Sequence, residues 1–148
     1  MKINPEEDGI THINIYSKGK TELGRFLSNF QLFPFLTPDG LFNSIEGYWY
    51  WLLCDHPEKD RLKKTSGYAA KLLGRQLKAQ DWNDSEEFKT KIKIAILIKV
   101  NYKLKDFFSS TLPFTHYYDY GGKVVKPKEG QWIIDYFNEL RIDNNQLK

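Results

Sequence analysis

The sequence predicts a helix-dominated α+β protein, a single domain with a few short strands. Apolar residues recur at helical spacing in four segments, alternating apolar residues occupy only short stretches, and turn residues separate the two kinds. A chain of 148 residues is long enough for one domain with a buried core. We therefore expect one domain over residues 1–148, with residues 1–9 and 142–148 as loosely held ends.

Short strands are expected in three places. Residues 11–17, "THINIYS", carry Ile13 and Ile15 on one face and predict a strand. Residues 26–42 are loop-like, but "PFLTPDGLF" at their end predicts a hairpin around the turn "PDG". Residues 121–127, "GGKVVKP", predict a short strand after a turn.

Helical periodicity predicts four helices. The first begins near Ser44, an acceptable N-cap, and the second covers residues 66–77. Asp84 and Glu87 form a possible capping box for a long helix that reaches about residue 107. The inner face of this long helix is expected to hold Phe88, Ile92, Ala95, Ile96, Val100 and Leu104, with Lys89, Lys93, Lys99 and Lys103 on much of the other side. The fourth helix covers residues 130–141.

The charge, cysteine and histidine content of the chain bears on which kinds of ligand and site the protein can have. The net charge of +3 tolerates an anionic ligand but is low for a nonspecific nucleic-acid binder. Cys54 is the only cysteine, which excludes an internal disulfide and predicts a buried thiol in its apolar run. His12, His56 and His116 lack ligand spacing, so no metal site is expected. With no signal peptide and no apolar run of membrane length, we expect a cytoplasmic protein without membrane contact.

Residues 24–53 gather many aromatic side chains around one carboxylate, Glu46. Glu46 falls in the first turn of the helix after Ser44, where the helix dipole favours the charged form, so we expect it to be ionised. By position alone it is more often a helix-start charge than a catalytic group. However, the four consecutive aromatics at 48–51 spread around the helix, so some must line a cleft, a second packing layer or a partner surface.

Four other polar or aromatic residues each have a structural interpretation. Asn29 suits a turn that bonds its own backbone. The positive charge of Arg75 can stabilise a helix C-terminus. Trp82 can pack as a hydrophobic staple on the long helix. Asp119 precedes two glycines and suits a turn.

The order of several motifs nevertheless resembles the YbiA-like, or NADAR, family. The segments "INIYS", "LGRFLSNF", "DGLFNSIEGYWYW", "AKLLGR" and "DW" follow one another before a Lys-rich helix. The resemblance covers about residues 13–99, and the pair formed by S-N-F and S-x-E-x-Y is its specific part. It implies the YbiA-like fold and an N-glycosidase that cleaves a bond between ribose C1 and nitrogen. The implied substrate is ADP-ribose on a guanine base in nucleic acid, or a related phosphoribosyl nucleotide.

The resemblance also implies the site residues. The family's glutamate falls on Glu46, and Asp119 corresponds to an acidic residue of the family's C-terminal segment, so both are candidate catalytic residues. The candidate substrate-binding residues are Asn29, Phe30, Trp49, Tyr50, Arg75, Trp82 and Tyr118. A carboxylate can stabilise positive charge on the ribose and deprotonate water, while aromatic rings stack the base. No metal, redox group or other cofactor is needed, and a monomer or small homo-oligomer is expected. A compact, divergent member would suit a phage protein that reverses ADP-ribosylation of DNA.

The helix after Glu46 departs from the family. Tyr50 and Leu53 stand where the family usually has glutamine and lysine, unless Lys59, Lys63 or Lys64 replaces the lysine. This departure favours an alternative, a catalytically impaired module that binds ADP-ribose or a similar nucleotide. A third hypothesis, a DNA-associated structural protein that uses the lysines of the long helix, ranks last because the net charge is small.

Overall fold

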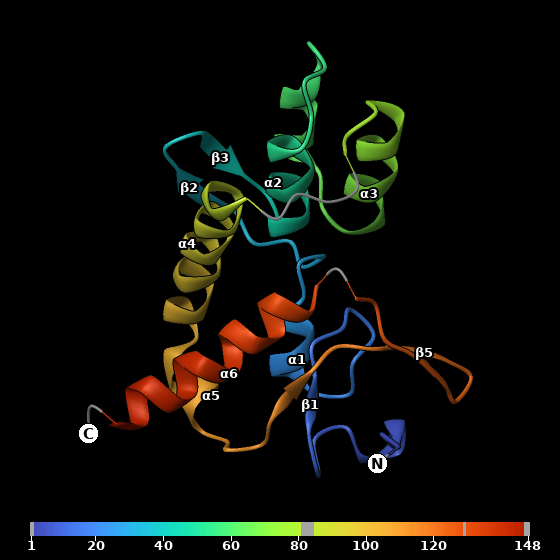
Figure 1. Cartoon of the computed structure of the whole chain (residues 1–148), viewed down its shortest axis with the longest axis vertical. Helices are drawn as coiled ribbons and strands as arrows, with labels where there is room; N and C mark the ends of the chain where they lie inside the picture. The colour runs from blue at the N-terminus through green and yellow to red at the C-terminus, as the bar shows by residue number, and fades with distance from the viewer. Residues whose placement is uncertain (1, 81–84, 129, 147–148) are drawn as a thin grey trace. The chain divides into compact units, whose positions relative to one another are not determined.

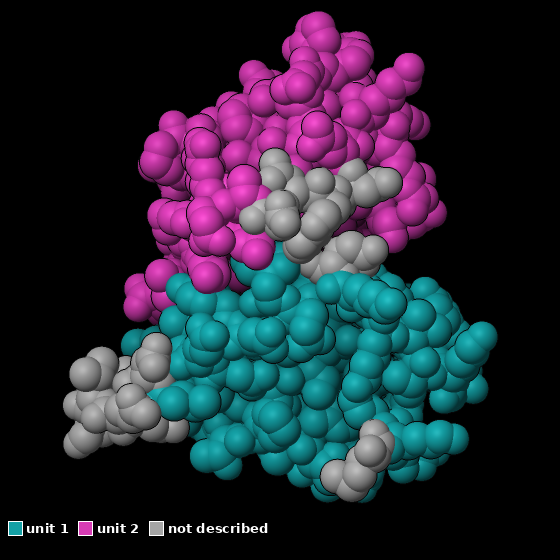
Figure 2. All heavy atoms as spheres, in the orientation of Figure 1, with its two compact units in different colours: residues 1–28, 103–148 teal, residues 29–102 magenta. Residues whose placement is uncertain are grey.

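The computed structural model describes residues 2–80, 85–128 and 130–146, and it has the helix-dominated α+β architecture that the sequence predicted (Figure 1). The chain packs as two compact units, shown in teal and magenta in Figure 2. The first unit combines residues 1–28 with residues 103–148, and the second is the intervening segment 29–102. The prediction of one domain over the whole chain stays a prediction.

The first unit contains short strands and helices from both ends of the chain. Its elements are η1 (Pro5–Glu7), β1 (Ile13–Asn14), α1 (Glu22–Leu27), α5 (Leu104–Phe108), β4 (Phe114–Thr115), β5 (Tyr118–Tyr120), β6 (Lys123–Val125) and α6 (Gln131–Gln146). Strand β1 runs parallel to β4, and β5 pairs with β6 as an antiparallel hairpin. Three buried rings from α5, β4 and α6 contact one another in the core, those of Phe107, Phe114 and Phe137.

Side-chain amides complete the backbone pairing of this unit. The Asn14 amide donates from Nδ2 to the Tyr117 carbonyl and accepts from the Tyr117 N–H, both at 3.0 Å. Asn138 satisfies both backbone groups of Phe114 in the same way, at 3.0 and 3.2 Å. These amides act as substitutes for neighbouring strands, because buried backbone groups need partners and the strands are only two or three residues long.

The second unit is built around one short helix. Its elements are β2 (Phe35–Thr37), β3 (Gly40–Phe42), α2 (Ile45–Leu52), η2 (Lys59–Lys64), α3 (Gly67–Gln76) and α4 (Glu86–Tyr102). Helix α2 contacts α3, η2, α4 and β3. Two glycines permit the close approach: a Cβ on Gly47 would lie 2.5 Å from the Leu62 carbonyl oxygen, and one on Gly74 would lie 2.6 Å from the Tyr50 ring.

Most sequence-predicted elements of the second unit are confirmed. The hairpin around "PDG" forms as β2 and β3, and the helices after Ser44 and over residues 66–77 form as α2 and α3. The Cys54 thiol is buried, as predicted. The long helix begins at Glu86, where the Ser85 Oγ accepts the Phe88 N–H at 3.2 Å. The predicted capping residue Asp84 lies outside the described residues.

Five predictions for individual segments are wrong. Helix α1 lies partly in the region predicted as loop, and residues 11–17 contribute only the short strand β1. The long helix ends at Tyr102, with α5 as a separate helix, and α6 continues past residue 141 to Gln146. The described part of the predicted loose N-terminus, residues 2–9, is held in place, because the buried Asp8 carboxylate accepts the N–H groups of Asn14 and Lys20, both at 2.9 Å.

The inner face of α4 differs from the prediction at two positions. The five apolar residues from Phe88 to Val100 are buried as expected, but Leu104 is exposed. Lys99, predicted on the outer side, is only 1% exposed, and burial lowers the pKa of its ammonium to about 7. Helical spacing gives the angle of a side chain around the axis, but the packing of neighbouring elements decides which angles are buried. Among the described residues, none of the helices has the length and apolar content needed to span a bilayer.

We predict that Asn14→Ala destabilises the protein by about 2–4 kcal/mol, because both backbone groups of Tyr117 would lose their partners inside the first unit. Urea denaturation followed by circular dichroism measures the change. Asn101→Ala is the matched control, since Asn101 is exposed on α4, and it should change the unfolding free energy by less than about 0.5 kcal/mol. Equal stability of the two variants would contradict the structural role of the Asn14 amide.

Candidate active site around Glu46

The N-terminus of α2 is capped by Ser44 and not by Glu46. The fully buried Ser44 Oγ accepts the Gly47 N–H at 3.0 Å and donates to the Thr65 carbonyl at 2.9 Å. The half-buried Glu46 carboxylate accepts no hydrogen bond from the residues that the structure describes. Helix capping therefore does not account for the carboxylate at this position.

A backbone hydrogen bond joins the two residues of the specific motif pair. The Glu46 N–H donates to the Asn29 carbonyl at 2.9 Å, and the Gly67 N–H, at the start of α3, donates to the Phe30 carbonyl at 3.0 Å. Residues 29 and 30 thus bind the first turns of both α2 and α3. The side-chain Oδ1 of Asn29 is buried and has no hydrogen-bond partner among the residues that the structure describes, so the interpretation of Asn29 as a turn residue bonded to its own backbone leaves this oxygen unexplained.

The Glu46 carboxyl is a weaker acid than the sequence suggested. Burial raises its pKa from 4.5 to about 7, and the positive charge of Lys71 on α3 opposes this rise. At neutral pH the Glu46 carboxyl is therefore about half ionised, less than the helix dipole alone predicts, because the cost of burying the charge opposes the dipole. A carboxyl with a pKa near 7 can exchange a proton readily at neutral pH, which suits acid–base catalysis.

Lys71 is a site residue that the sequence motifs did not reveal. It lies within "AKLLGR", one helical turn before Arg75, and its position on the face of α3 near Glu46 depends on the packing of α2 against α3. Arg75 itself is exposed in the last turn of α3, where its charge is favourable at the helix C-terminus. A signal was available in the spacing of the two basic residues, because positions four apart share one face of a helix.

Two of the three lysines named as possible substitutes, Lys59 and Lys63, contact other groups. The Lys59 ammonium lies 3.8 Å from the centre of the Trp51 ring and donates to the Cys54 carbonyl at 3.1 Å. Lys63 pairs with Asp60 at 3.5 Å. Among the described residues, Lys71 is the cation that lowers the pKa of Glu46.

The aromatic candidates take part in packing. The Trp49 ring meets Phe88 of α4 edge to face at 4.8 Å, and Tyr50 packs against Gly74 of α3. Phe30 is half-buried, and its carbonyl binds α3 as described above. These contacts correspond to the second packing layer that the sequence allowed for the aromatics at 48–51. Trp82 lies outside the described residues.

Asp119 and Tyr118 belong to the first unit, on strand β5. Asp119 Oδ1 accepts the Gly122 N–H at 2.7 Å, which is the turn geometry that its structural interpretation predicted. The Tyr118 ring lies 5.8 Å from the Tyr16 ring and 5.3 Å from the His116 ring. Among the described residues, Asn29, Phe30, Trp49, Tyr50 and Arg75 share the second unit with Glu46, while Asp119 and Tyr118 do not.

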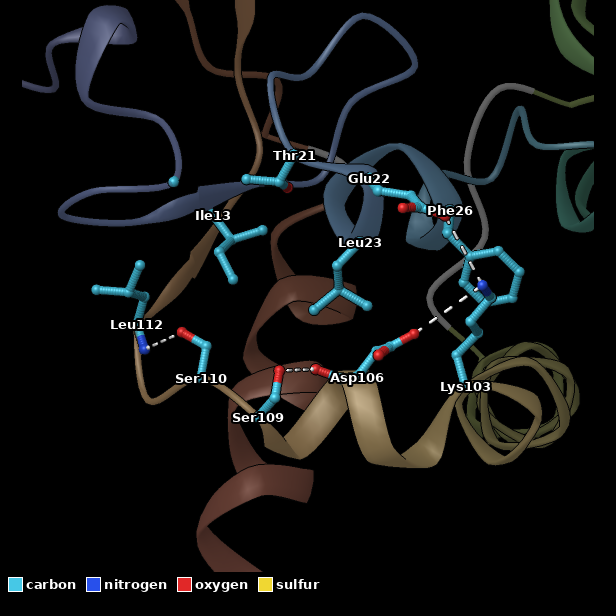
Figure 3. Close-up of a pocket in the computed structure, with 11 residues that line it drawn as sticks. Ile13, Thr21, Glu22, Leu23, Phe26, Lys103, Asp106, Ser109, Ser110 and Leu112 are labelled. Atoms are coloured by element: carbon cyan, nitrogen blue, oxygen red, sulfur yellow. Dashed lines mark hydrogen bonds and ion pairs between the residues drawn. The ribbon is translucent and has the colours of Figure 1, made fainter.

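The first unit also contains a cavity of about 320 Å³ beside α1 and α5 (Figure 3). Ile13 and Leu23 project into it, and Leu112 is another lining residue. At one side the Lys103 Nζ lies 3.8 Å from Glu22 Oε1 and 3.9 Å from Asp106 Oδ2. None of the sequence-predicted site residues that the structure describes lines this cavity. Within the described parts of the chain, no group of three or more His, Cys, Asp or Glu side chains could hold a metal ion.

Comparison of the chain with family models, with curated proteins and with solved structures finds no match. The resemblance to the YbiA-like family therefore stays a prediction from the ordered motifs.

We predict that Glu46→Gln stabilises the protein at alkaline pH. The folded pKa lies above the ordinary value, so the folded state holds the proton more tightly and stability falls as pH rises from about 4.5 through 7. The neutral glutamine avoids this loss. Its advantage in unfolding free energy over the wild type should grow by about 2–3 kcal/mol between pH 5 and pH 8.

Urea denaturation at the two pH values measures this change. Glu58→Gln is the matched control, because Glu58 is exposed and its effect should not vary with pH over this range. A constant difference between Glu46→Gln and the wild type would show that Glu46 ionises in the folded protein as it does in the unfolded chain.

Proposed function

We propose that this protein is an N-glycosidase that hydrolyses the bond between ribose C1 and a nitrogen, with ADP-ribose on a guanine base of nucleic acid, or a related ribosyl nucleotide, as substrate. The observation that supports it best is the pairing of Glu46 and Asn29 through a backbone hydrogen bond. Within the described parts of the chain, the Glu46 carboxylate accepts no hydrogen bond, and the buried Oδ1 of Asn29 has no hydrogen-bond partner. Unsatisfied polar groups are costly, and sites that bind ligands are where such costs are retained.

The proposed reaction follows from these groups. The C1–N bond breaks with its electron pair moving to the base, and positive charge develops on the ribose. The ionised Glu46 carboxylate stabilises this charge and accepts a proton from water, whose hydroxyl adds to C1. Glu46 then transfers that proton to the nitrogen of the departing base, which neutralises the base and regenerates the carboxylate. A rotation of the Asn29 side chain presents its oxygen to a sugar hydroxyl, and Lys71 and Arg75 supply positive charge for phosphates.

A nucleotide-binding module without turnover is the second candidate. It is favoured by the positions where the family has glutamine and lysine. Leu53 is buried in the core and has no polar group, and Tyr50, whose ring packs on Gly74, carries a phenol where the family has an amide. Tight binding of ADP-ribose in calorimetry, with no cleavage of any ribosyl–nitrogen substrate, would select this candidate over the enzyme.

We predict that the wild type releases ADP-ribose from an oligonucleotide that carries ADP-ribosylated guanine, and that Glu46→Gln lowers this rate at least 100-fold. The loss follows from removal of the group that stabilises the ribosyl cation and activates water. Chromatography of the released nucleotide measures the rate. Glu58→Gln, an exposed change of the same charge, should keep the wild-type rate. Equal release by the wild type and Glu46→Gln would remove Glu46 from the mechanism.

We predict that kcat/KM rises with pH through about 7, since the ionised form of Glu46 is the active one. Lys71→Met removes the charge that lowers the pKa of Glu46, so it should move the midpoint of the profile to higher pH. Lys71→Arg should leave the midpoint in place, as should Lys64→Met at an exposed position of η2. A midpoint that Lys71→Met does not move would show that Lys71 has no influence on the reacting carboxylate.

A further inference from the structure

The second unit contains a cavity of about 410 Å³ between the β2–β3 turn and the first turns of α4. Carbon atoms of Pro38 and Ile94 contribute to its walls, and Asp39 and Tyr48 lie beside each other at its edge. Glu46 does not line this cavity. Because Tyr48 follows Glu46 by two residues on α2, the two side chains project from different faces of the helix. The cavity is therefore separate from the candidate active site.

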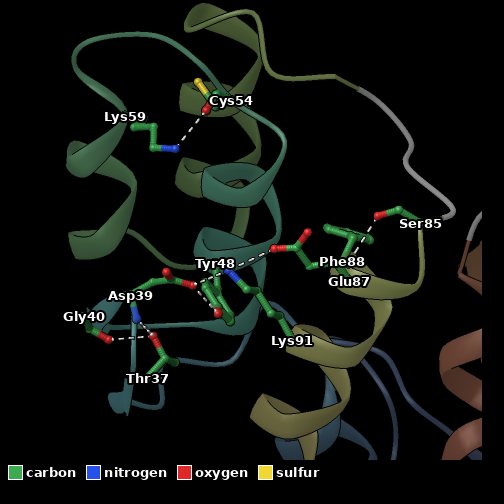
Figure 4. A network of polar contacts seen from close by, with 10 residues as sticks. All are labelled: Thr37, Asp39, Gly40, Tyr48, Cys54, Lys59, Ser85, Glu87, Phe88 and Lys91. Carbon is green, nitrogen blue, oxygen red and sulfur yellow. Dashed lines mark hydrogen bonds and ion pairs between the residues drawn. The ribbon is translucent and has the colours of Figure 1, made fainter.

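Asp39 has one oxygen that is free to bind a ligand. The Tyr48 hydroxyl donates to Asp39 Oδ2 at 2.8 Å, and the Lys91 ammonium donates to the same atom at 3.2 Å (Figure 4). Within the described residues, the other oxygen, Oδ1, accepts no hydrogen bond. The side chain of Asp39 is 21% exposed, so Oδ1 belongs to a group that is partly desolvated but reachable.

The charge of the cavity is negative. Burial alone would raise the pKa of Asp39, but the hydrogen bonds from Tyr48 and Lys91 lower it overall, so the group is a carboxylate at neutral pH. Glu86 and Glu87 also line the cavity, and among the described residues Lys91 is the cation that lines it. The positive charge of Lys59, which is not a lining residue, also lowers the pKa of Asp39. Three carboxylates against one ammonium leave a formal charge of −2.

We propose that this cavity binds an organic cation, a primary ammonium or guanidinium group on an apolar chain. The cationic head donates to Asp39 Oδ1, and the chain lies against Pro38 and Ile94. An anion is disfavoured because it would meet three carboxylates, and the first-turn glutamates already take the favourable places at the N-terminus of α4. A neutral guest of equal size would gain the apolar contact but not the charged hydrogen bond.

The test compares two probes of matched size, 4-phenylbutylammonium and 4-phenylbutanol, by titration of the full chain in methyl NMR spectra. The ammonium probe should bind at least tenfold more tightly than the alcohol and should shift the Ile94 methyl signals, which lie in the cavity wall. Equal affinity for the two probes, or binding that leaves the Ile94 signals unmoved, would overturn the proposal.

Asp39→Asn should reduce the ammonium affinity to that of the alcohol. Asp55→Asn is the matched control, an equal loss of charge at an exposed position of the same unit, and it should keep the tenfold preference. Glu86→Gln with Glu87→Gln gives a second test at exposed positions that does not disturb the Tyr48 hydrogen bond, and it should weaken ammonium binding at least threefold. An unchanged preference in both sets of variants would contradict a role for these carboxylates.

The same cationic head occurs in free amines and in the lysine side chains of proteins. A capped alanine peptide with one central lysine, compared with its norleucine counterpart, distinguishes the two sources. Binding of the lysine peptide at the strength of the free amine would identify a protein side chain as an accepted guest. Binding of the free amine alone would restrict the guests to small molecules, and either result supports recognition of a cation. The outcome does not bear on the reaction proposed for Glu46.

Discussion

The hydrogen bonds that residues 29 and 30 accept from the first turns of α2 and α3 are the constraint on which the second unit depends. A third link, from the Ser44 hydroxyl to the Thr65 carbonyl, ties the start of α2 to the segment just before α3. Free N–H groups at helix starts need acceptors, and here a loop supplies some of them. Two helix starts and the loop that carries Asn29 are therefore held together without any sheet. This arrangement places Asn29, Glu46 and Lys71 in one part of the unit although they are far apart in sequence.

Because Ser44 performs the capping, Glu46 is not required for the helix to begin. Its burial is then a net cost to folding at neutral pH, since the raised pKa means that ionisation destabilises the folded state. A glutamine would fit the same volume without this cost. The presence of a buried carboxyl at position 46 is easier to explain by a chemical role than by a contribution to stability. This difference is the physical basis of the proposed function.

The sequence was sufficient for features that local rules control, and insufficient where tertiary contacts decide. The β2–β3 hairpin and the helices α2 and α3 follow from turn residues and periodicity, and all three form. The strand expected over residues 11–17 shortens because the Asn14 side chain, and not a neighbouring strand, supplies partners to the Tyr117 backbone. Lys71 was missed and Lys99 was misplaced for one reason: spacing fixes the direction of a side chain, but only packing shows what it meets. The resemblance implies that Asn29 and Glu46 share one site, and this stays a prediction; the structure shows a backbone hydrogen bond between the two residues.

The four aromatics that follow Glu46 serve different neighbours around one helix. Tyr48 bonds the hairpin turn, Trp49 meets α4, Tyr50 meets α3 and Trp51 donates to Asp60 of η2. Helix α2 is therefore the centre of the second unit, and its aromatic sequence is explained by packing in four directions. Glu46 lies one turn before Tyr50 and thus on the face toward α3, where Lys71 also lies. The cavity beside Tyr48, for which we propose an organic cation as ligand, lies on another face of α2. A change at one of these sites should consequently affect the other only if it disturbs α2 itself.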